Sequence, residues 1–156
     1  MIKIIKEILV ITTWIGISVF FGLWLNNNVI VNAQVVSASM EGTIMTHSRV
    51  LGLRMFGQIQ RGDIVVFEKC GFDGVLIKRV IALPGETIEI IDGITFINEI
   101  ALHEEYKKEP TNTGFDPIVV CDGKFFVMGD NRNNSYDSRA FGLVCITMIL
   151  GRIHIY

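Results

Sequence analysis

Residues 75–90 have the sequence VLIKRVIALPGETIEI, in which two runs rich in β-branched residues flank a short break. Within that break, Leu83-Pro84-Gly85-Glu86 predicts a type II turn, because proline presets φ at the second position and glycine accepts the positive φ of the third. Runs of this composition bounded by turn residues are typical of strands. The segment therefore predicts two strands that are joined by a tight turn.

The same pattern continues on both sides of this segment. Short apolar runs separated by turn residues predict strands at residues 64–67, 75–81, 87–90, 94–97, 118–120, 124–128 and 143–150. Asn98-Glu99 is placed to close a hairpin after residues 94–97, whereas the polar residues 107–117 predict a loop that leaves the main sheet. Because no helical periodicity interrupts these runs, we expect an all-β domain over residues 26–156, with an excursion at about residues 87–122.

An uncharged stretch precedes the β-rich part of the chain. Residues 8–25 (ILVITTWIGISVFFGLWL) contain no charged residue. At about 1.5 Å per residue they form a helix roughly 27 Å long, close to the thickness of a bilayer core. Lys3 and Lys6 precede the stretch and no charge follows it until Glu41, so the positive-inside rule predicts a cytoplasmic amino terminus. We therefore expect a cytoplasmic tail at residues 1–7, a transmembrane signal anchor at residues 8–25 and an extracytoplasmic β domain.

Two other interpretations of residues 8–25 stay open. Val31-Asn32-Ala33 is similar to the small-residue cleavage site of a secretory signal, although it lies far beyond the apolar run. A buried core helix is the second interpretation, but it would need other apolar helices to pack around it, and the sequence predicts none. The length and flanking charges of the stretch favour the membrane anchor.

The composition also limits the partners and cofactors of the chain. With 50% hydrophobic residues, 19% charged residues and a net charge of -2, the chain has no basic cluster of the kind that binds a phosphate backbone. The three cysteines, Cys70, Cys121 and Cys145, form no C-x-x-C pair and match no histidine spacing. We therefore expect no nucleic-acid partner, no metal site and no cofactor.

Lys78 is the unusual residue of the strand predicted at residues 75–81. Strand alternation directs Lys78 and Arg79 to opposite faces, and each face also carries aliphatic side chains. One interpretation makes both cations rim charges on an edge strand, where charges oppose aggregation. The other makes Lys78 a buried general base, which requires burial to lower its pKa from the ordinary value of about 10.4. A nucleophile beside the amine would favour the second interpretation.

Four segments of the chain resemble those of type I signal peptidases, in the order expected for that family. Residues 35–43 (VVSASMEGT) resemble the Ser-Met box, and residues 61–67 (RGDIVVF) resemble a further family segment. Residues 77–86 (IKRVIALPGE) resemble the lysine box, and residues 129–142 (GDNRNNSYDSRAFG) resemble the carboxy-terminal box. The four segments follow one amino-terminal anchor and span nearly the whole predicted ectodomain.

The resemblance implies a Ser-Lys dyad. Ser39 is expected to be the nucleophile that attacks the scissile carbonyl, and Lys78 is expected to take its proton and later protonate the leaving amine. Ser37 matches the position whose hydroxyl joins the backbone N–H of Ser39 in the oxyanion hole. The expected intermediate is an acyl-enzyme.

The resemblance also implies supporting and substrate-binding residues. Ser135 matches the residue that orients the lysine amine, and Asp137 and Arg139 match a supporting ion pair. Small substrate side chains are expected to bind along two strands that flank the dyad, at residues 31–36 and 74–77. The residues implied for this substrate binding are Val35, Val36, Met40, Leu76 and Ile77.

By resemblance the fold is a coiled antiparallel β-sheet ectodomain behind one N-terminal transmembrane helix. The implied function is that of a membrane-bound endopeptidase that removes N-terminal signal peptides from exported preproteins, with the lipid bilayer as its second partner. A self-cleaving repressor shares the dyad, but it needs a DNA-binding module where this chain has an apolar span. A non-catalytic assembly or chaperone protein for secreted or pilin subunits is the alternative from a different class, and the presence of Ser39 and Lys78 opposes it.

Two positions depart from the family pattern. Gly42 stands where the family commonly has proline, so we expect a more flexible segment after Ser39 and an effect on substrate choice. Some atypical relatives serve pilus assembly, which makes pilin subunits a candidate substrate class. Asn133 replaces the aspartate usual in the carboxy-terminal box, which removes a charge and puts any ion pair of that residue in question.

Overall fold

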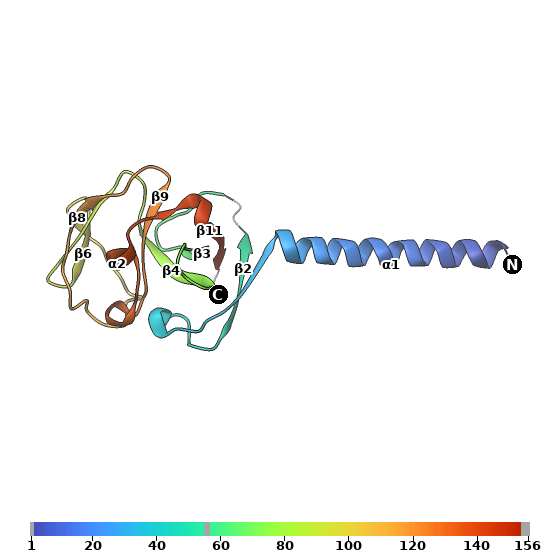
Figure 1. Ribbon diagram of the computed structural model, residues 1–156, viewed down its shortest axis with the longest axis horizontal. Helices are drawn as coiled ribbons and strands as arrows, with labels where there is room; N and C mark the ends of the chain where they lie inside the picture. The colour runs from blue at the N-terminus through green and yellow to red at the C-terminus, as the bar shows by residue number, and fades with distance from the viewer. Residues whose placement is uncertain (1, 55–56, 154–156) are drawn as a thin grey trace.

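A long amino-terminal helix projects from a body built of β-strands in the computed structural model of the chain, which describes residues 2–54 and 57–153 (Figure 1). The helix, α1 (Ile2–Asn28), extends beyond the predicted span of residues 8–25 at both ends. The predicted limits at residues 1 and 156 lie outside the described residues. The other helices are single turns: η1 (Ala38–Met40), η2 (Arg132–Asn134), α2 (Ser138–Phe141) and η3 (Ile146–Met148).

The strands form two antiparallel sheets. The larger sheet has the order β1-β2-β11-β3-β4-β9-β10, and the smaller sheet has the order β7-β6-β5-β8. The strands of the larger sheet are β1 (Ile30–Gln34), β2 (Arg49–Arg54), β3 (Ile64–Glu68), β4 (Val75–Ala82), β9 (Lys124–Met128), β10 (Val144–Cys145) and β11 (Ile149–Ile153). Those of the smaller sheet are β5 (Thr87–Ile91), β6 (Ile94–Ile97), β7 (Ile100–Ala101) and β8 (Phe115–Val119).

The two predicted turns are confirmed. Gly85 has a φ of 83°, and the backbone N–H of Glu86 donates to the carbonyl of Leu83 at 3.2 Å, as a type II turn requires. Asn98 and Glu99 both have positive φ, at 49° and 67°, and they join β6 to β7. The strands predicted at residues 64–67, 75–81, 87–90, 94–97 and 124–128 are confirmed as β3, β4, β5, β6 and β9.

Two predicted segments are wrong in their boundaries. Residues 143–150 do not form one strand, because β10 pairs with β9 whereas β11 pairs with β2 and β3 on the opposite side of β4. The chain crosses between these positions through η3. The predicted loop at residues 107–117 is too long, because β8 already begins at Phe115, which pairs with Ile90 of β5. The strand predicted at residues 118–120 therefore starts earlier.

Strand β2 was not predicted from the sequence, and β1 was implied by the family resemblance but not by its own pattern. In β1, Val31 and Ala33 are buried, and the polar Asn32 and Gln34 between them are exposed. This alternation is the period of a half-buried strand, but only two small apolar residues carry it. The signal was therefore weaker than in the β-branched runs of β3 and β4.

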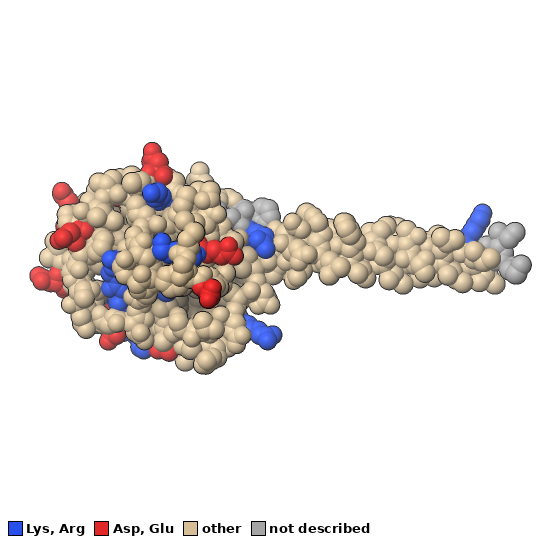
Figure 2. Space-filling view, in the orientation of Figure 1, with Lys and Arg blue, Asp and Glu red and all other residues tan. Residues whose placement is uncertain are grey.

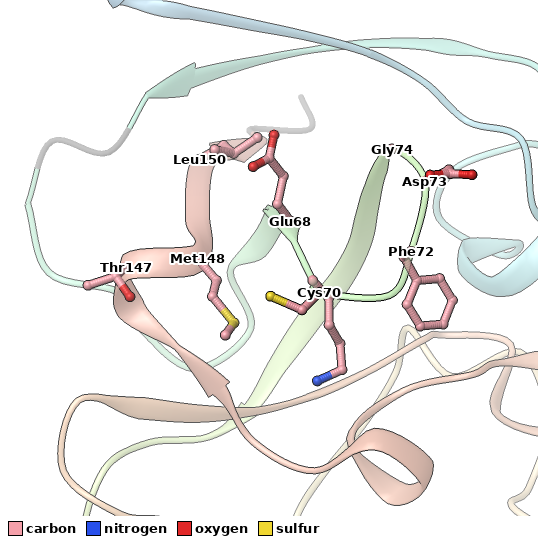
Figure 3. Close-up of a pocket in the computed structure, with 9 residues that line it drawn as sticks. Glu68, Cys70, Phe72, Asp73, Gly74, Thr147, Met148 and Leu150 are labelled. Atoms are coloured by element: carbon pink, nitrogen blue, oxygen red, sulfur yellow. The ribbon is translucent and has the colours of Figure 1, made fainter.

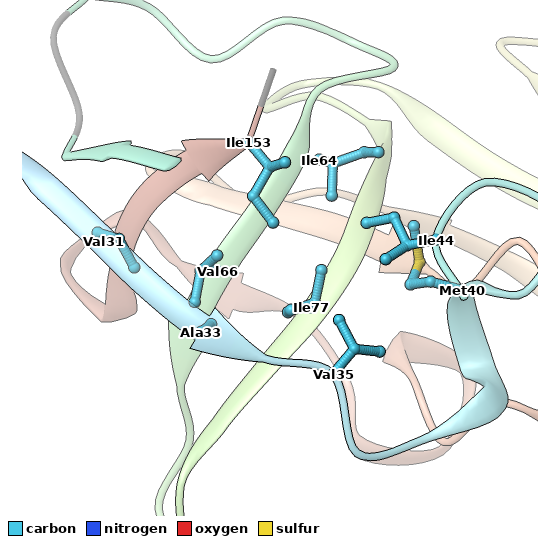
Figure 4. Packing of buried hydrophobic residues seen from close by; sticks show 9 residues of the cluster. All are labelled: Val31, Ala33, Val35, Met40, Ile44, Ile64, Val66, Ile77 and Ile153. Carbon is cyan, nitrogen blue, oxygen red and sulfur yellow. The ribbon is translucent and has the colours of Figure 1, made fainter. Parts of the chain in front are cut away.

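One apolar cluster fixes the chain that follows α1 against the centre of the larger sheet. Its side chains come from β1, the turn after β1, β3, β4 and β11, and they face one another in Figure 4. The members are Val31, Ala33, Val35, Met40, Ile44, Ile64, Val66, Ile77 and Ile153. Full burial of one such aliphatic side chain contributes about 1.5–3 kcal/mol. The cluster therefore holds the η1 turn over β4.

Helix α1 is not part of this core. Among the described residues it is the one helix long and apolar enough to cross a membrane, and its apolar part is not buried against the body. On the face that Figure 2 shows, a basic residue lies near its N-terminal end and no charge follows along its length. The interpretation of residues 8–25 as a buried core helix is therefore wrong.

Candidate active site

The η1 turn holds Ser39 in a fixed backbone environment. The carbonyl of Ser39 accepts a hydrogen bond from the backbone N–H of Asn131 at 3.0 Å, and the carbonyl of Ala38 accepts one from Asn131 Nδ2 at 3.1 Å. On the other side of the turn, the N–H of Ile44 donates to the carbonyl of Met40 at 2.8 Å. Ser39 itself is 6% exposed. The turn is thus tied to the segment after β9 by both groups of Asn131.

Lys78 lies opposite this turn on β4. Its Nζ donates a hydrogen bond to Ser39 Oγ at 2.5 Å, and the residue is only 3% exposed. Arg79 is also buried, at 9%, so the interpretation of both cations as rim charges is wrong. The fold therefore brings a serine hydroxyl and a buried lysine amine into direct contact.

Burial makes the neutral form of the Lys78 amine more accessible than in an ordinary lysine. Burial lowers the pKa of Lys78 from 10.5 to about 8, and the positive charge of Arg139 acts in the same direction. The carboxylates of Asp137 and Asp130 oppose this change without cancelling it. Near pH 7.4 a group with a pKa of about 8 is neutral in roughly one molecule in five, against roughly one in a thousand for an ordinary lysine.

Ser37 approaches the same hydroxyl from the start of the turn. Its Oγ lies 3.1 Å from Ser39 Oγ, within hydrogen-bond distance. Ser37 has an extended backbone, with φ of -122° and ψ of 155°, and immediately precedes η1. If Ser39 Oγ attacked a carbonyl carbon, the Ser37 hydroxyl would be close enough to donate a hydrogen bond to the oxygen of that carbonyl.

Ser135 lies close to the dyad without bonding either member. Its Oγ is buried and has no hydrogen-bond partner among the described residues. A Cβ added at Gly129 would collide with both Ser135 Oγ and the Ser39 carbonyl, so these two groups lie on the same side of Gly129. The structure therefore leaves an unpaired hydroxyl beside the nucleophile turn, and it shows no hydrogen bond between Ser135 and Lys78.

Asp137 and Arg139 form a bidentate ion pair. Arg139 Nε and Nη2 donate to the two carboxylate oxygens of Asp137 at 2.9 and 2.8 Å, and the Asp137 side chain is fully buried. Asp137 also accepts from the backbone N–H of Gly129 at 3.1 Å, and Arg139 donates to the carbonyl of Arg132 at 2.6 Å. The pair thus holds together the loop that carries Ser135.

The five residues implied for substrate binding separate into three groups. Val35, Met40 and Ile77 pack together in the apolar cluster beneath the η1 turn (Figure 4). Leu76 packs against a second cluster on the other face of β4. Val36 is 76% exposed. Of the three groups, the first packs directly beneath the turn that carries Ser39.

A second buried ion pair was not predicted from the sequence. Arg79 Nε and Nη2 donate to the two carboxylate oxygens of Asp130 at 2.9 and 2.7 Å, and Asp130 also accepts from Thr43 Oγ1. Both members belong to segments that resemble the family, but neither their spacing nor their neighbours indicated that they would meet. The pair connects β4 to the segment after β9, and Thr43 ties it to the segment after η1.

The two departures from the family pattern have definite positions. Gly42 has a φ of 107°, which proline cannot adopt because its ring fixes φ near -65°. Asn133 takes no part in an ion pair, since it accepts from the N–H of Asn112 at 2.9 Å and donates to the carbonyl of Pro110 at 2.9 Å. At this position an amide can do both, whereas a carboxylate could only accept.

A hollow at the end of the β3–β4 hairpin is distinct from this site. It has a volume of about 480 Å³, and Figure 3 shows Cys70 and Phe72 on the hairpin opposite Thr147 and Met148. Neither Ser39 nor Lys78 lines it. The dyad therefore lies outside this cavity.

A serine hydroxyl bonded to a buried lysine amine on an antiparallel β fold is the arrangement that a Ser-Lys hydrolase requires. The chain matches the family described as "Signal peptidase, peptidase S26" over residues 4–156. It therefore belongs to the signal peptidase family S26, a family of serine endopeptidases that remove signal peptides from preproteins.

Individual relatives agree with this family. The chain is 36% identical to "Signal peptidase I" of Leptolyngbya laminosa over 88% of its own length and 73% of the relative. It is 37% identical to "Signal peptidase I S" of Bacillus subtilis over 94% of its own length and 86% of the relative. Among solved structures, it resembles a signal peptidase I from Enterococcus faecalis, with a TM-score of 0.58 and 33% identity over 64% of this chain and 100% of that one.

Proposed function

We propose that this protein is a membrane-anchored signal peptidase in which Ser39 and Lys78 form the catalytic dyad. The observation that supports the proposal most strongly is the 2.5 Å contact between Lys78 Nζ and Ser39 Oγ. Burial of the lysine supports it further, because a base must lose its proton near neutral pH.

The reaction begins when the neutral Lys78 amine accepts the Ser39 proton. Ser39 Oγ then bonds to the scissile carbonyl carbon, and the resulting oxyanion accepts hydrogen bonds from the Ser37 hydroxyl and the backbone N–H of Ser39. As the C–N bond breaks, the Lys78 ammonium returns the proton to the leaving amine, which becomes the new amino terminus. A water molecule, deprotonated by Lys78, hydrolyses the acyl-enzyme and releases the signal peptide.

The substrate adds a strand to the sheet beside the dyad. In the described part of the chain, β1 pairs only with β2, and residues 75–78 of β4 pair only with β3. An extended peptide therefore finds unpaired backbone groups on both sides of Ser39, as β-augmentation requires. Val35, Met40 and Ile77 form the apolar floor against which small side chains of the signal peptide pack, with the exposed Val36 next to Val35 in the chain. Leu76 packs on the other face of β4 and is not part of this floor.

Helix α1 crosses the bilayer once, with the amino terminus in the cytoplasm. Lys3 and Lys6 at its start support this orientation. Trp14 and Trp24 both lie within its apolar part. Ser39 follows the end of the helix at Asn28 closely, so the dyad lies near the outer membrane surface. Tethering raises the effective concentration of enzyme at the place where signal peptides leave the bilayer.

Two other assignments receive less support. A non-catalytic chaperone would have no need for a lysine buried against a serine hydroxyl, because burial of its charge opposes folding. No observation favours pilin subunits over other exported preproteins as substrates.

The test is cleavage of a preprotein by the full chain in lipid vesicles. We expect the wild type to release a product whose amino terminus follows the signal peptide, and Ser39→Ala to release none. Ser48→Ala is the matched control, because within the described residues the Ser48 hydroxyl donates only to the nearby Met45 carbonyl, and it should cleave as the wild type does. Equal cleavage by wild type and Ser39→Ala would disprove the proposal.

A further inference from the structure

A buried carboxylate lies outside all four segments that resemble the family. Glu104 belongs to the connection between β7 and β8 of the smaller sheet, and its side chain is 2% exposed. It accepts from Arg132 Nη2 at 2.5 Å, from Arg132 Nη1 at 3.0 Å, from Thr95 Oγ1 at 2.9 Å and from the Tyr106 hydroxyl at 3.2 Å. Both oxygens of this carboxylate therefore accept hydrogen bonds from groups inside the protein.

Arg132 carries this contact into the loop that follows β9. Its side chain is fully buried, and its Nε donates to the carbonyl of Gly129 at 3.0 Å. Gly129 in turn donates its N–H to Asp137, and a side chain there would strike the Ser39 carbonyl. Arg132 therefore fixes the backbone of Gly129, which directly precedes Asp130 and Asn131.

Tyr106 makes a second connection from the same segment. Its ring packs over the guanidinium of Arg79, with 4.0 Å between the guanidinium carbon and the ring centroid, and Arg79 is paired with Asp130. The backbone N–H of Lys108 donates to the carbonyl of Asp130 at 3.1 Å. Residues 104–108 thus hold Asp130 through both its side chain and its backbone.

Asn131 holds the η1 turn that carries Ser39. Asn131 follows Asp130 and supplies the two hydrogen bonds to the carbonyls of Ala38 and Ser39. A continuous path of buried contacts therefore runs from Glu104 through Arg132 and Gly129 to Asn131 and Ser39. Hydrogen bonds join Glu104 to Arg132, Arg132 to Gly129 and Asn131 to Ser39, and Asp130 links Gly129 covalently to Asn131. The first member of the path lies in the connection between two strands of the smaller sheet.

The charge of Glu104 is retained at neutral pH. Burial raises its pKa, but the hydrogen bond and the charge of Arg132 outweigh this effect and hold the pKa below its usual value. Removal of one partner of such a buried pair leaves the other charge uncompensated. Neutralising Glu104 would therefore leave the buried charge of Arg132 uncompensated.

We propose that Glu104 is a positioning residue of the peptidase, which sets the position of Ser39 relative to Lys78 through Arg132 and Asn131. The smaller sheet thereby takes part in catalysis without touching the substrate. This inference rests on the proposed function for its kinetic test, and it also has a test that needs no activity.

The kinetic test compares two adjacent glutamates in the detergent-solubilised full chain. Glu104→Gln preserves shape but removes the charge, and we expect kcat to fall about tenfold or more with KM little changed, because small displacements of reacting groups lower rates strongly. Glu105→Gln is the matched control, since the pair of Glu105 with His103 is 84% and 86% exposed. It should leave both constants unchanged.

A double-mutant cycle separates positioning from general destabilisation. Glu104 and Asn131 share no hydrogen bond in the described part of the chain, so independent structural effects would multiply in the rate. If both act on Ser39 along one path, kcat of Glu104→Gln combined with Asn131→Ala should fall less than the product of the two single effects. A double-mutant effect equal to the product of the two single effects, or an unchanged kcat in Glu104→Gln beside an active wild type, would overturn the inference.

Hydrogen exchange tests the same path without a substrate. The N–H of Asn131, bonded to the Ser39 carbonyl, should exchange at least about tenfold faster in Glu104→Gln, whereas the amides of β3 should be unchanged. Equal exchange at Asn131 would overturn the inference even if the protein cleaved nothing. If Glu104→Gln does not fold, Tyr106→Phe removes one hydrogen bond to the same carboxylate. Faster exchange at Asn131 in that variant would then support the inference, and equal exchange would overturn it.

Discussion

Lys78 Nζ and Ser39 Oγ lie 2.5 Å apart although 39 positions separate the two residues in the sequence. Strand β4 fixes the lysine by pairing with β3, where Lys78 lies opposite Val65. The serine is fixed by Asn131, which comes from the segment after β9. The dyad is therefore a product of tertiary structure, and its geometry depends on three parts of the chain.

Replacement of Lys78 by methionine should not destabilise the protein near neutral pH. Burial lowers the folded pKa of Lys78 to about 8, whereas an unfolded lysine has a pKa of about 10.4. Between these values the unfolded chain binds more protons, so wild-type stability rises with pH there, and a penalty of about 3 kcal/mol is fully present below pH 8. Methionine is uncharged and of similar length, so it removes this penalty.

Urea unfolding of wild type and Lys78→Met at pH 7 and pH 10 measures the difference. We expect the variant to be at least as stable at pH 7, with a smaller advantage at pH 10. A loss of several kcal/mol in Lys78→Met at pH 7 would instead identify Lys78 as a structural cation.

Ser135→Ala should lower the rate without lowering stability. The Ser135 hydroxyl is buried and unpaired in the described part of the chain, so its removal takes away a buried polar group rather than a hydrogen bond. If this hydroxyl orients the Lys78 amine during the reaction, kcat falls while the melting temperature is maintained.

Ser138→Ala is the matched comparison for Ser135→Ala. Ser138 Oγ accepts from the backbone N–H of Val127 at 2.9 Å, so this variant should lose about 1–3 kcal/mol of stability. A Ser135→Ala enzyme with wild-type kcat would show that this hydroxyl has no part in catalysis.

Ser37→Ala should reduce kcat about 10²–10³-fold, which corresponds to the loss of one oxyanion donor. Its Oγ lies 3.1 Å from Ser39 Oγ, and loss of the hydroxyl leaves only the backbone N–H to stabilise the oxyanion. Ser37→Thr retains a hydroxyl and should recover part of the rate. Steady-state kinetics on a peptide substrate provide the measurement, and a Ser37→Ala enzyme within twofold of wild type would remove Ser37 from the oxyanion hole.

The orientation of the chain in the membrane has its own test. External protease added to intact cells should digest the β body and spare residues 1–7, because Lys3 and Lys6 retain the amino terminus in the cytoplasm. The mature protein should retain residues 8–25. An amino terminus at Gln34 would show instead that α1 is removed as a signal, as the sequence Val31-Asn32-Ala33 allows.

The strongly apolar strands could be predicted from the sequence because each carries its own signal. The β-branched runs of β3 and β4 and the Pro84-Gly85 turn need no partner to be recognised. Strand β1 has only two inward apolar residues, and the split of residues 143–150 into β10 and β11 depends on pairing with different strands. Those features are tertiary, so local patterns could not specify them.

The site shows the same division. Ser39 and Lys78 were identified through resemblance to a family, since their distance in the sequence gives no indication of contact. Glu104 was not identified, because a glutamate in a polar segment after β7 is an ordinary surface residue by its pattern. Its burial follows only from Arg132, which approaches it from the loop after β9.

The most direct test of the account is the pH dependence of kcat/KM for peptide cleavage by the wild type. Only the neutral Lys78 amine can take the Ser39 proton, and burial lowers its pKa to about 8. The account predicts a tenfold rise per pH unit below about pH 8 and a plateau above it. A rate that is flat from about pH 6 to pH 10 would contradict the assignment of Lys78 as the base.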